Sequence, residues 1–264
     1  MRPTAHYLLE TEAHVYALAI AASTLLAFYP FLTVMLSLCH NILHSRAAEA
    51  AIYLGIGDFF AGEPGQFFTR NLQPWMVGQI RITSMVLLLF TSNGIFEPLE
   101  VALNRAWGVK ENRSYLKNQL VSLGLILACG ALALLSLMFT GLNRQWIADW
   151  AGQGRAATWL ELLCFKVAAL PVSMLGLFLV YWLLPNRKIE PARVAPVAIL
   201  VGLALEALKY INLLVWPLLH DKLDREYRAF QHSVTILLWS FTAAMIVLAG
   251  AHWTARHDTR DPLS

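Results

Sequence analysis

Residues 13 to 43 form a continuous apolar run that contains no Asp, Glu, Lys or Arg. Such a run exceeds the roughly 20 residues that an α-helix needs to cross the hydrocarbon core of a bilayer. Further runs with apolar cores follow along the rest of the chain. We therefore predict about six transmembrane helices in a single transmembrane domain over residues 1–264, with spans at 13–43, 82–104, 119–142, 162–184, 194–219 and 233–253.

The composition of the chain supports a membrane protein of the helical type. It is 58% hydrophobic and only 14% charged, whereas a soluble domain is about 45–50% apolar and about 25% charged. A single globular core in a chain of this length cannot bury so many apolar side chains, so lipid is the expected solvent. Long continuous runs predict helices, since a membrane barrel would alternate polar and apolar residues. The predicted fold class is an all-α polytopic membrane bundle.

The longest connection, from residue 45 to residue 81, differs from a solvated linker. It contains several glycines and prolines, but also the apolar pairs Phe59–Phe60 and Phe67–Phe68. Aromatic side chains of this kind favour short helices that lie in the membrane interface. The distribution of Lys and Arg over the connections places both chain termini in the cytoplasm by the positive-inside rule.

Two opposite charges interrupt the fifth predicted span near its middle. Glu206 and Lys209 are three residues apart, so they share one face of a helix and can pair. A charge at the bilayer centre costs about 2.5–3.5 kcal/mol on insertion scales, and for that reason it is rare. Two interpretations stay open: a polar substrate path in the bundle interior, or an internal ion pair that fixes helix packing.

A second polar group lies at the end of the second predicted span. Glu97, Glu100 and Asn104 fall on one helical stripe, and Pro98 removes the donor to the carbonyl of Gly94. A polar, interruptible helix can expose its backbone to a transported substrate or ion. The alternative is a helix that becomes polar as it leaves the membrane.

Three basic residues close to the predicted cytoplasmic ends are candidates for binding an anion. Arg105 follows the second span, and Arg187 and Lys188 form a short basic turn after the fourth span. Residues of this kind bind anionic lipid headgroups. They also act as topology charges that orient the chain.

No motif points to an enzyme, a metal or a cofactor. His40 and His44 have the spacing of two helical metal ligands, but no further ligand stands nearby, and a metal site needs at least three protein ligands. Cys39, Cys129 and Cys164 lie in apolar runs without paired spacing. There is no dense basic cluster, which argues against nucleic acid as a partner. The expected partners are membrane lipids, with other envelope proteins as a further class.

Several stretches along nearly the whole chain resemble the YihY/virulence factor BrkB family of bacterial inner-membrane proteins. The resemblance is carried by the following stretches: Leu26-Ala-Phe-Tyr-Pro-Phe-Leu32, residues 93–109, Leu183-Leu-Pro-Asn-Arg187, Leu205-Glu-Ala-Leu-Lys-Tyr210 and Tyr227-Arg-Ala-Phe230. The Asn104-Arg105 pair and the Pro-Asn-Arg turn are its most specific parts. One departure stands at His252, where members commonly have an acidic residue.

The resemblance implies six transmembrane helices in the inner membrane with both termini cytoplasmic. It also implies links to serum resistance and to the export of lipid or lipopolysaccharide, for which the family is a candidate flippase. Members of the family have also been labelled ribonuclease BN. We expect a transporter or translocase of lipids or anionic amphiphiles. A non-catalytic membrane scaffold is the alternative, and a membrane-bound ribonuclease ranks last because no metal-held carboxylates or histidine acid–base pair stand at a suitable spacing.

Overall fold

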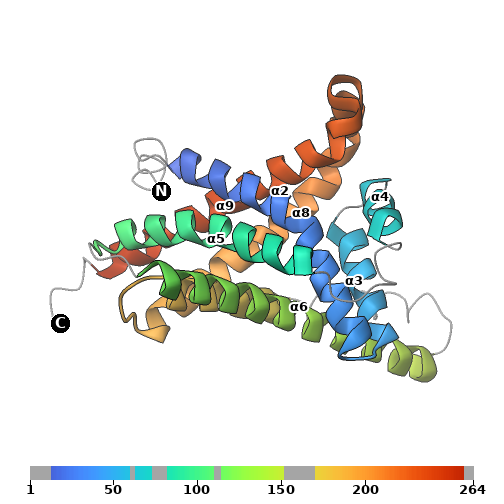
Figure 1. Cartoon of the computed structure of the whole chain (residues 1–264), viewed down its shortest axis with the longest axis horizontal. Coiled ribbons are helices and arrows are strands. Elements are labelled where there is room, and N and C mark those ends of the chain that lie inside the picture. The colour runs from blue at the N-terminus through green and yellow to red at the C-terminus, as the bar shows by residue number, and fades with distance from the viewer. Residues whose placement is uncertain (1–12, 60–62, 73–81, 110–113, 152–169, 259–264) are drawn as a thin grey trace. The chain divides into compact units, whose positions relative to one another are not determined.

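The computed structural model describes residues 13–59, 63–72, 82–109, 114–151 and 170–258. Every regular element within these ranges is a helix, as the sequence predicts (Figure 1). The described helices are α2 (Ala13–Asn41), α3 (Arg46–Phe59), α4 (Glu63–Leu72), α5 (Ile82–Ala106), α6 (Tyr115–Ala151), the helix Leu170–Leu183, α8 (Pro191–Tyr227), the 3-10 turn η2 (Arg228–Phe230) and α9 (Gln231–Asp258). The all-α class is confirmed.

Three of the described helices are long and apolar enough to cross a membrane, namely Ala13–Asn41, Pro191–Asn212 and Gln231–Trp253. Shorter apolar helices occur at Ala48–Gly57, Leu116–Leu132 and Leu170–Leu183. A helical membrane protein is thereby confirmed. The division into six spans stays a prediction, and residues 162–169 of the fourth predicted span lie outside the described ranges.

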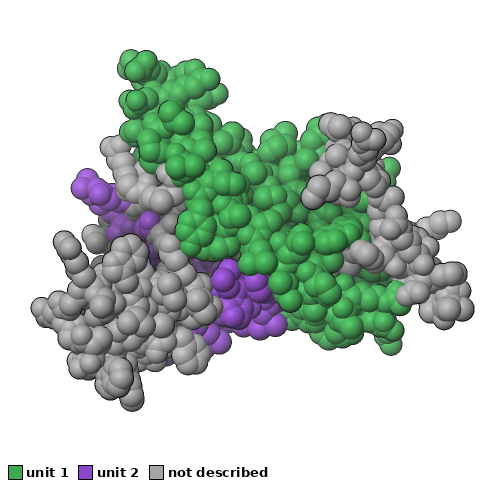
Figure 2. All heavy atoms as spheres, turned by 180° about the vertical axis from the view of Figure 1, so that it is seen from behind, with its two compact units in different colours: residues 1–28, 87–126, 177–264 green, residues 29–86, 127–176 purple. Residues whose placement is uncertain are grey.

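The chain divides into two compact units, which are coloured separately in Figure 2. Unit 1 comprises residues 1–28, 87–126 and 177–264, and unit 2 comprises residues 29–86 and 127–176. Helix α2 passes from one unit to the other next to Pro30, which removes one backbone hydrogen bond from the helix. All eight polar site residues predicted from the sequence belong to unit 1.

In unit 1, helices α8 and α9 form an antiparallel pair (Figure 1), and Tyr181 of the helix Leu170–Leu183 contacts α9. Gly250 of α9 makes close packing possible, because a Cβ there would collide with Val201 and lie 2.7 Å from the hydroxyl of Tyr181. Small residues let membrane helices approach in this way. Tyr181 is 1% exposed, and its hydroxyl donates to the carbonyl of Val247 at 2.7 Å.

Helix α5 ends at a glycine in the left-handed conformation. Gly108 has φ +64°, its N–H donates to the carbonyl of Arg105 at 3.2 Å, and the N–H of Val109 donates to the carbonyl of Asn104 at 2.8 Å. This pair of bonds is the Schellman motif, which satisfies carbonyls that the last helical turn leaves without partners. The motif fixes the direction in which the chain leaves the helix.

Gly108→Ala is expected to lower the free energy of unfolding by about 1 kcal/mol, because an L side chain is disfavoured in the left-handed region. A Cβ at this position meets nothing within 4 Å, so the effect is one of the backbone alone. Gly108→Asn should retain most of the stability, since Asn tolerates this conformation. Thermal unfolding in detergent measures both variants, and an unchanged Tm for Gly108→Ala would contradict the prediction.

In unit 2, the long first connection forms two short helices, as expected from its aromatic residues. The hydroxyl of Ser45 caps α3 by accepting from the N–H of Ala48 at 3.2 Å. Phe68 of α4 is 1% exposed and packs edge-on against Tyr29 of α2, with ring centroids 6.1 Å apart. The presence of the helices is confirmed, while their position in the membrane interface stays a prediction.

Candidate functional site

The last two turns of α5 carry a buried polar pair. Glu100 is 4% exposed and Asn104 is 3% exposed. The two residues are one helical turn apart, and the Nδ2 group of Asn104 lies 3.5 Å from the Oε1 atom of Glu100. This is a long hydrogen bond. A carboxylate this deep in an apolar bundle needs such polar neighbours, since an uncompensated buried charge is costly.

Asn104 also joins α5 to the turn that follows the helix Leu170–Leu183. Its Oδ1 atom accepts the backbone N–H of Asn186 at 2.8 Å, across 82 positions of sequence. The residues before Asn186 in this turn, Leu184 and Pro185, are fully buried. The two sequence segments that carry the family resemblance most specifically therefore meet through one amide side chain.

Arg187 follows Asn186 and lies over the indole of Trp107, with its Cζ atom 6.0 Å from the ring centroid. Trp107 is 8% exposed, whereas Arg187 is exposed. This distance is at the outer limit for a cation–π interaction. The contact places the guanidinium directly beside the end of α5.

Arg105 and Lys188 are exposed, and each is close in sequence to one of the two asparagines. Arg105 is the chain neighbour of Asn104, and Lys188 stands two residues after Asn186, so their Cα atoms lie within about 4 Å and 7 Å of those of these asparagines. The backbones of the three predicted anion-binding residues thus lie close to the hydrogen bond between Asn104 and Asn186. Whether they bind an anion stays a prediction.

The structure divides the predicted stripe of Glu97, Glu100 and Asn104. Glu97 is exposed, while the other two residues are buried. Of the two buried residues, Asn104 contacts the turn that contains Pro185, through its bond to Asn186. Helix α5 is also continuous through Pro98, and Gly94 packs closely against Ser23 of α2, where a Cβ would lie 2.5 Å from the serine hydroxyl.

The second predicted pair forms on α8. The Nζ atom of Lys209 lies 3.8 Å from the Oε1 atom of Glu206, and the two side chains are 16% and 22% exposed. Both residues lie about 22–27 Å along the helix axis from Pro191, within the apolar part of α8. The predicted pairing is confirmed. A partly exposed ion pair between apolar turns is compatible with both interpretations of its role.

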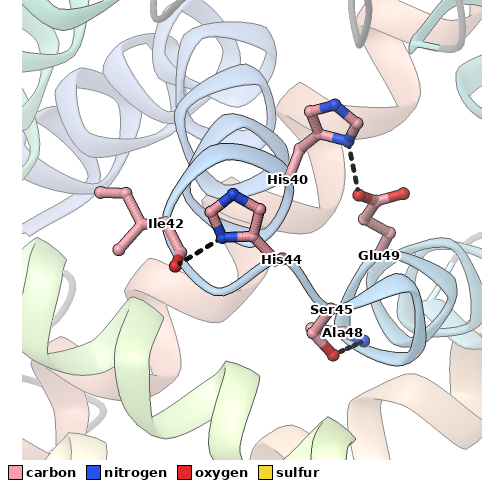
Figure 3. Close-up of polar contacts among 6 residues, drawn as sticks. All are labelled: His40, Ile42, His44, Ser45, Ala48 and Glu49. Atoms are coloured by element: carbon pink, nitrogen blue, oxygen red, sulfur yellow. Dashed lines mark hydrogen bonds and ion pairs between the residues drawn. The ribbon is translucent and has the colours of Figure 1, made fainter.

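His40 and His44 make separate contacts at the corner between α2 and α3 (Figure 3). The ring of His40 donates from Nδ1 to the carboxylate of Glu49 at 2.9 Å, and His44 donates to the carbonyl of Ile42 at 3.2 Å. Burial raises the pKa of the nearby Tyr53 phenol, and the charge of Glu49 raises it further. In the described part of the chain, no group of three His, Cys, Asp or Glu side chains could hold a metal ion.

Trp107 and Tyr181 are two residues whose contacts the sequence did not reveal. The position of Trp107 at the end of an apolar run indicates an interfacial anchor, and only the fold brings Arg187 to its ring. Tyr181 occurs inside an apolar run, where nothing marks its bond to Val247. The sequence feature that indicates this contact region is Gly250, because small residues often occur where membrane helices pack closely.

The sequence model of one protein family, described as Virulence factor BrkB, matches residues 5–263. A UPF0761 membrane protein of Acinetobacter baylyi is 28% identical over 89% of this chain. A UPF0761 membrane protein of Laribacter hongkongensis is 27% identical over 90% of it. A third, from Chlorobium chlorochromatii, is 23% identical over 93%.

The chain spans about half the length of these relatives, since each alignment covers 56% of the longer protein. No solved structure matches the chain significantly. The relatives indicate the family and a membrane location. The function is inferred from the polar contacts of unit 1.

Proposed function

The chain belongs to the virulence factor BrkB family, and from this premise we propose that it is a transporter-like protein that moves a lipid or another anionic amphiphile across the bacterial inner membrane. Both termini lie in the cytoplasm in this proposal. The protein acts without a cofactor and without chemical conversion of its substrate.

The observation that carries the proposal is the ion pair of Glu206 and Lys209. Each charge is costly in a membrane helix, and the two side chains are only partly covered, at 22% and 16% exposure. Full burial of an ion pair carries a large desolvation cost, so apolar side chains of similar volume would serve packing alone at least as well. Partial exposure leaves the pair open to a polar group that passes along α8.

The contacts at the end of α5 support the same function. An amphiphile needs a basic entry site for its anionic headgroup, and Arg105, Arg187 and Lys188 supply exposed positive charge there. The headgroup can follow polar side chains while its acyl chains stay in lipid. Glu100 and Asn104 belong to the framework that holds this entry site, because both are almost completely buried.

A lipid-flip assay in proteoliposomes tests the proposal. Fluorescent phospholipids are reduced by a quencher from the outside, and the fraction that remains protected reports the inner leaflet. We expect the wild type to accelerate flipping of an anionic lipid over empty liposomes, and Glu206→Ala and Lys209→Ala each to abolish the acceleration. A folded wild type that flips no anionic amphiphile would contradict the proposal.

A non-catalytic scaffold in envelope assembly is the second candidate. It is favoured by the confirmed pairing itself, because Glu206 and Lys209 neutralise each other and can fix a helix contact without any substrate. In that case Glu206→Ala and Lys209→Ala would weaken capture of a partner protein and leave lipid movement at the level of empty liposomes. A ribonuclease is the least favoured candidate.

A further inference from the structure

Two contacts fix the register of the antiparallel pair of α8 and α9 (Figure 1). At one end, the Nδ1 atom of His220 on α8 lies 2.7 Å from the Nε2 atom of Gln231 on α9. At the other end, a Cβ on Gly250 of α9 would collide with Val201 of α8. Positions 201 and 220 on α8 are 19 residues apart, and so are positions 231 and 250 on α9. The two helices therefore keep one register between these contacts.

In this register, the facing positions nearest the tip of the hairpin all carry polar atoms. On each helix these positions recur every three or four residues, which places them on one stripe. The facing pairs are Lys209 with Thr242, Asn212 with Trp239, Trp216 with Thr235 and His220 with Gln231. Gln231 and Thr235 are 5% and 1% exposed. We call these eight residues the polar seam.

The opposite surface of the same part of α8 is apolar. Ile211, Leu214 and Leu218 are 50%, 78% and 79% exposed. A helix pair in water has the reverse arrangement, with apolar side chains between the helices, whereas polar side chains in a membrane face the protein interior or a water-filled cavity. The candidate span of α9 begins at Gln231, which contacts His220. The polar seam therefore lies at membrane depth, with lipid on its outer side.

The indole of Trp239 indicates that the seam holds water. Its Nε1 atom is buried and has no hydrogen-bond partner among the residues that the structure describes. Buried donors of this kind are normally satisfied by protein groups or by ordered water. The hydroxyls of Thr235 and Thr242 donate to the carbonyls four residues earlier, at 2.8 and 2.9 Å, and a hydroxyl oxygen that donates can still accept. Water between the helices can thus bond to both stripes.

The polar seam connects the tip of the hairpin with the ion pair on α8. From His220 to Lys209 the helix advances by about 17 Å, which is about half the thickness of the hydrocarbon core. Beyond His220, the tip exposes the charged residues Asp221, Lys222, Asp224 and Arg225 to solvent. At the inner end, the Nζ atom of Lys209 lies 3.8 Å from the Oε1 atom of Glu206.

We propose that the polar seam is a water-filled path that carries protons from the tip of the hairpin to the carboxylate of Glu206. A hydronium ion at the inner end transfers one proton to this carboxylate, which becomes a neutral carboxylic acid, and a water molecule remains. Lys209 keeps its charge, and its ammonium is released from the carboxylate to attract an anionic headgroup. Return of the proton to water restores the ion pair.

The use of the proton rests on the proposed function and adds to it a source of energy. With both termini in the cytoplasm, the tip between α8 and α9 lies on the periplasmic side, so protons enter from there. Lys209 and Tyr210 are the titratable groups on α8 closest in sequence to Glu206, and α9 has no ionisable side chain from Ser233 to Ala251. Tyr181 contacts α9 at Val247, and His232 lies at the outer end of the path.

Cysteine reactivity measures the hydration of the seam without any transport. In a chain whose three native cysteines are replaced by serine, Thr235→Cys places a thiol in the seam, and Leu218→Cys places one on the lipid side at similar depth. A water-soluble methanethiosulfonate reacts with the thiolate, which apolar surroundings disfavour. We expect Thr235→Cys to react at least about tenfold faster than Leu218→Cys. Should Thr235→Cys not fold, Thr242→Cys probes the same stripe.

Proton entry is measured in proteoliposomes that contain an entrapped pH dye and are exposed to an acidic outer buffer. The wild type should accelerate proton entry over empty liposomes, and Glu206→Gln should lose this acceleration, because an amide does not take up the proton. Thr235→Cys should lose its proton entry after N-ethylmaleimide has modified the thiol. Leu218→Cys is the matched control, since the same modification on the lipid side should leave its proton entry unchanged.

Three results would overturn the inference. Equal reaction rates of Thr235→Cys and Leu218→Cys show that the seam is dry. Proton entry at the rate of empty liposomes in the folded wild type, or at the wild-type rate in Glu206→Gln, removes the proton path. Lipid flipping in the same liposomes decides the proposed function separately: flipping without proton entry contradicts only the inference, and proton entry without flipping contradicts only the proposed function.

Discussion

Lys209→Met is expected to lower the free energy of unfolding by about 3 kcal/mol, the cost of breaking a buried ion pair by removing one of its partners. Glu206 then keeps a carboxylate in the apolar part of α8 without the ammonium that lies 3.8 Å away. Met preserves much of the volume and flexibility of the lysine stem, so the change isolates the charge. Thermal and denaturant unfolding in detergent micelles measure the effect.

Lys222→Met is the matched control for this variant. Lys222 is exposed near the end of the same helix, beyond the apolar part of α8, and its substitution should change stability by less than about 0.5 kcal/mol. The double variant Glu206→Gln/Lys209→Met should recover most of the loss, because replacing both members of an ion pair removes the uncompensated charge. Equal stability of Lys209→Met and Lys222→Met would contradict the account.

Gly250→Ala has the second-largest expected effect, a loss of about 1–3 kcal/mol from overpacking. The new methyl group would collide with Val201, which is 1% exposed and β-branched, and with the Tyr181 hydroxyl at 2.7 Å. Neither side chain can turn away without losing its own packing. The bond from Tyr181 to the carbonyl of Val247 should weaken at the same time.

Gly124→Ala provides the comparison for the glycine substitution. Gly124 is also helical, in α6, but a Cβ there would meet nothing within 4 Å. Its substitution should leave the Tm unchanged or raise it slightly, since alanine is the better helix former. A Tm for Gly250→Ala that equals the Tm for Gly124→Ala would show that α8 and α9 do not approach as closely as described.

The sequence predicts the helical class well because backbone N–H and C=O groups in lipid must be hydrogen-bonded within the protein, which a helix achieves by itself. An uncharged run such as 13–43 has few alternatives to a spanning helix, and α2 indeed covers Ala13–Asn41. The pairing of Glu206 with Lys209 is equally local, since three residues on one helix fix it. Features that depend on a few neighbouring residues were therefore accessible from the sequence.

The candidate site at the end of α5 depends on contacts that the sequence cannot supply. Asn104 and Asn186 are 82 positions apart, and no periodicity connects them. The helical spacing alone likewise does not distinguish the exposed Glu97 from the buried Glu100 and Asn104. The family resemblance includes both the segment with Asn104 and the turn with Asn186. Only the fold shows that the side chain of Asn104 accepts a hydrogen bond from the backbone of that turn.

The most direct test of the central claim is lipid flipping by the double variant Glu206→Gln/Lys209→Met, in proteoliposomes that contain equal amounts of folded protein. The variant should regain the stability of the wild type, so a transport defect cannot be attributed to unfolding. We predict that the wild type accelerates flipping of an anionic phospholipid and that the stable double variant does not. A double variant that flips lipid as fast as the wild type would show that the ion pair serves packing alone and would contradict the proposed path along α8.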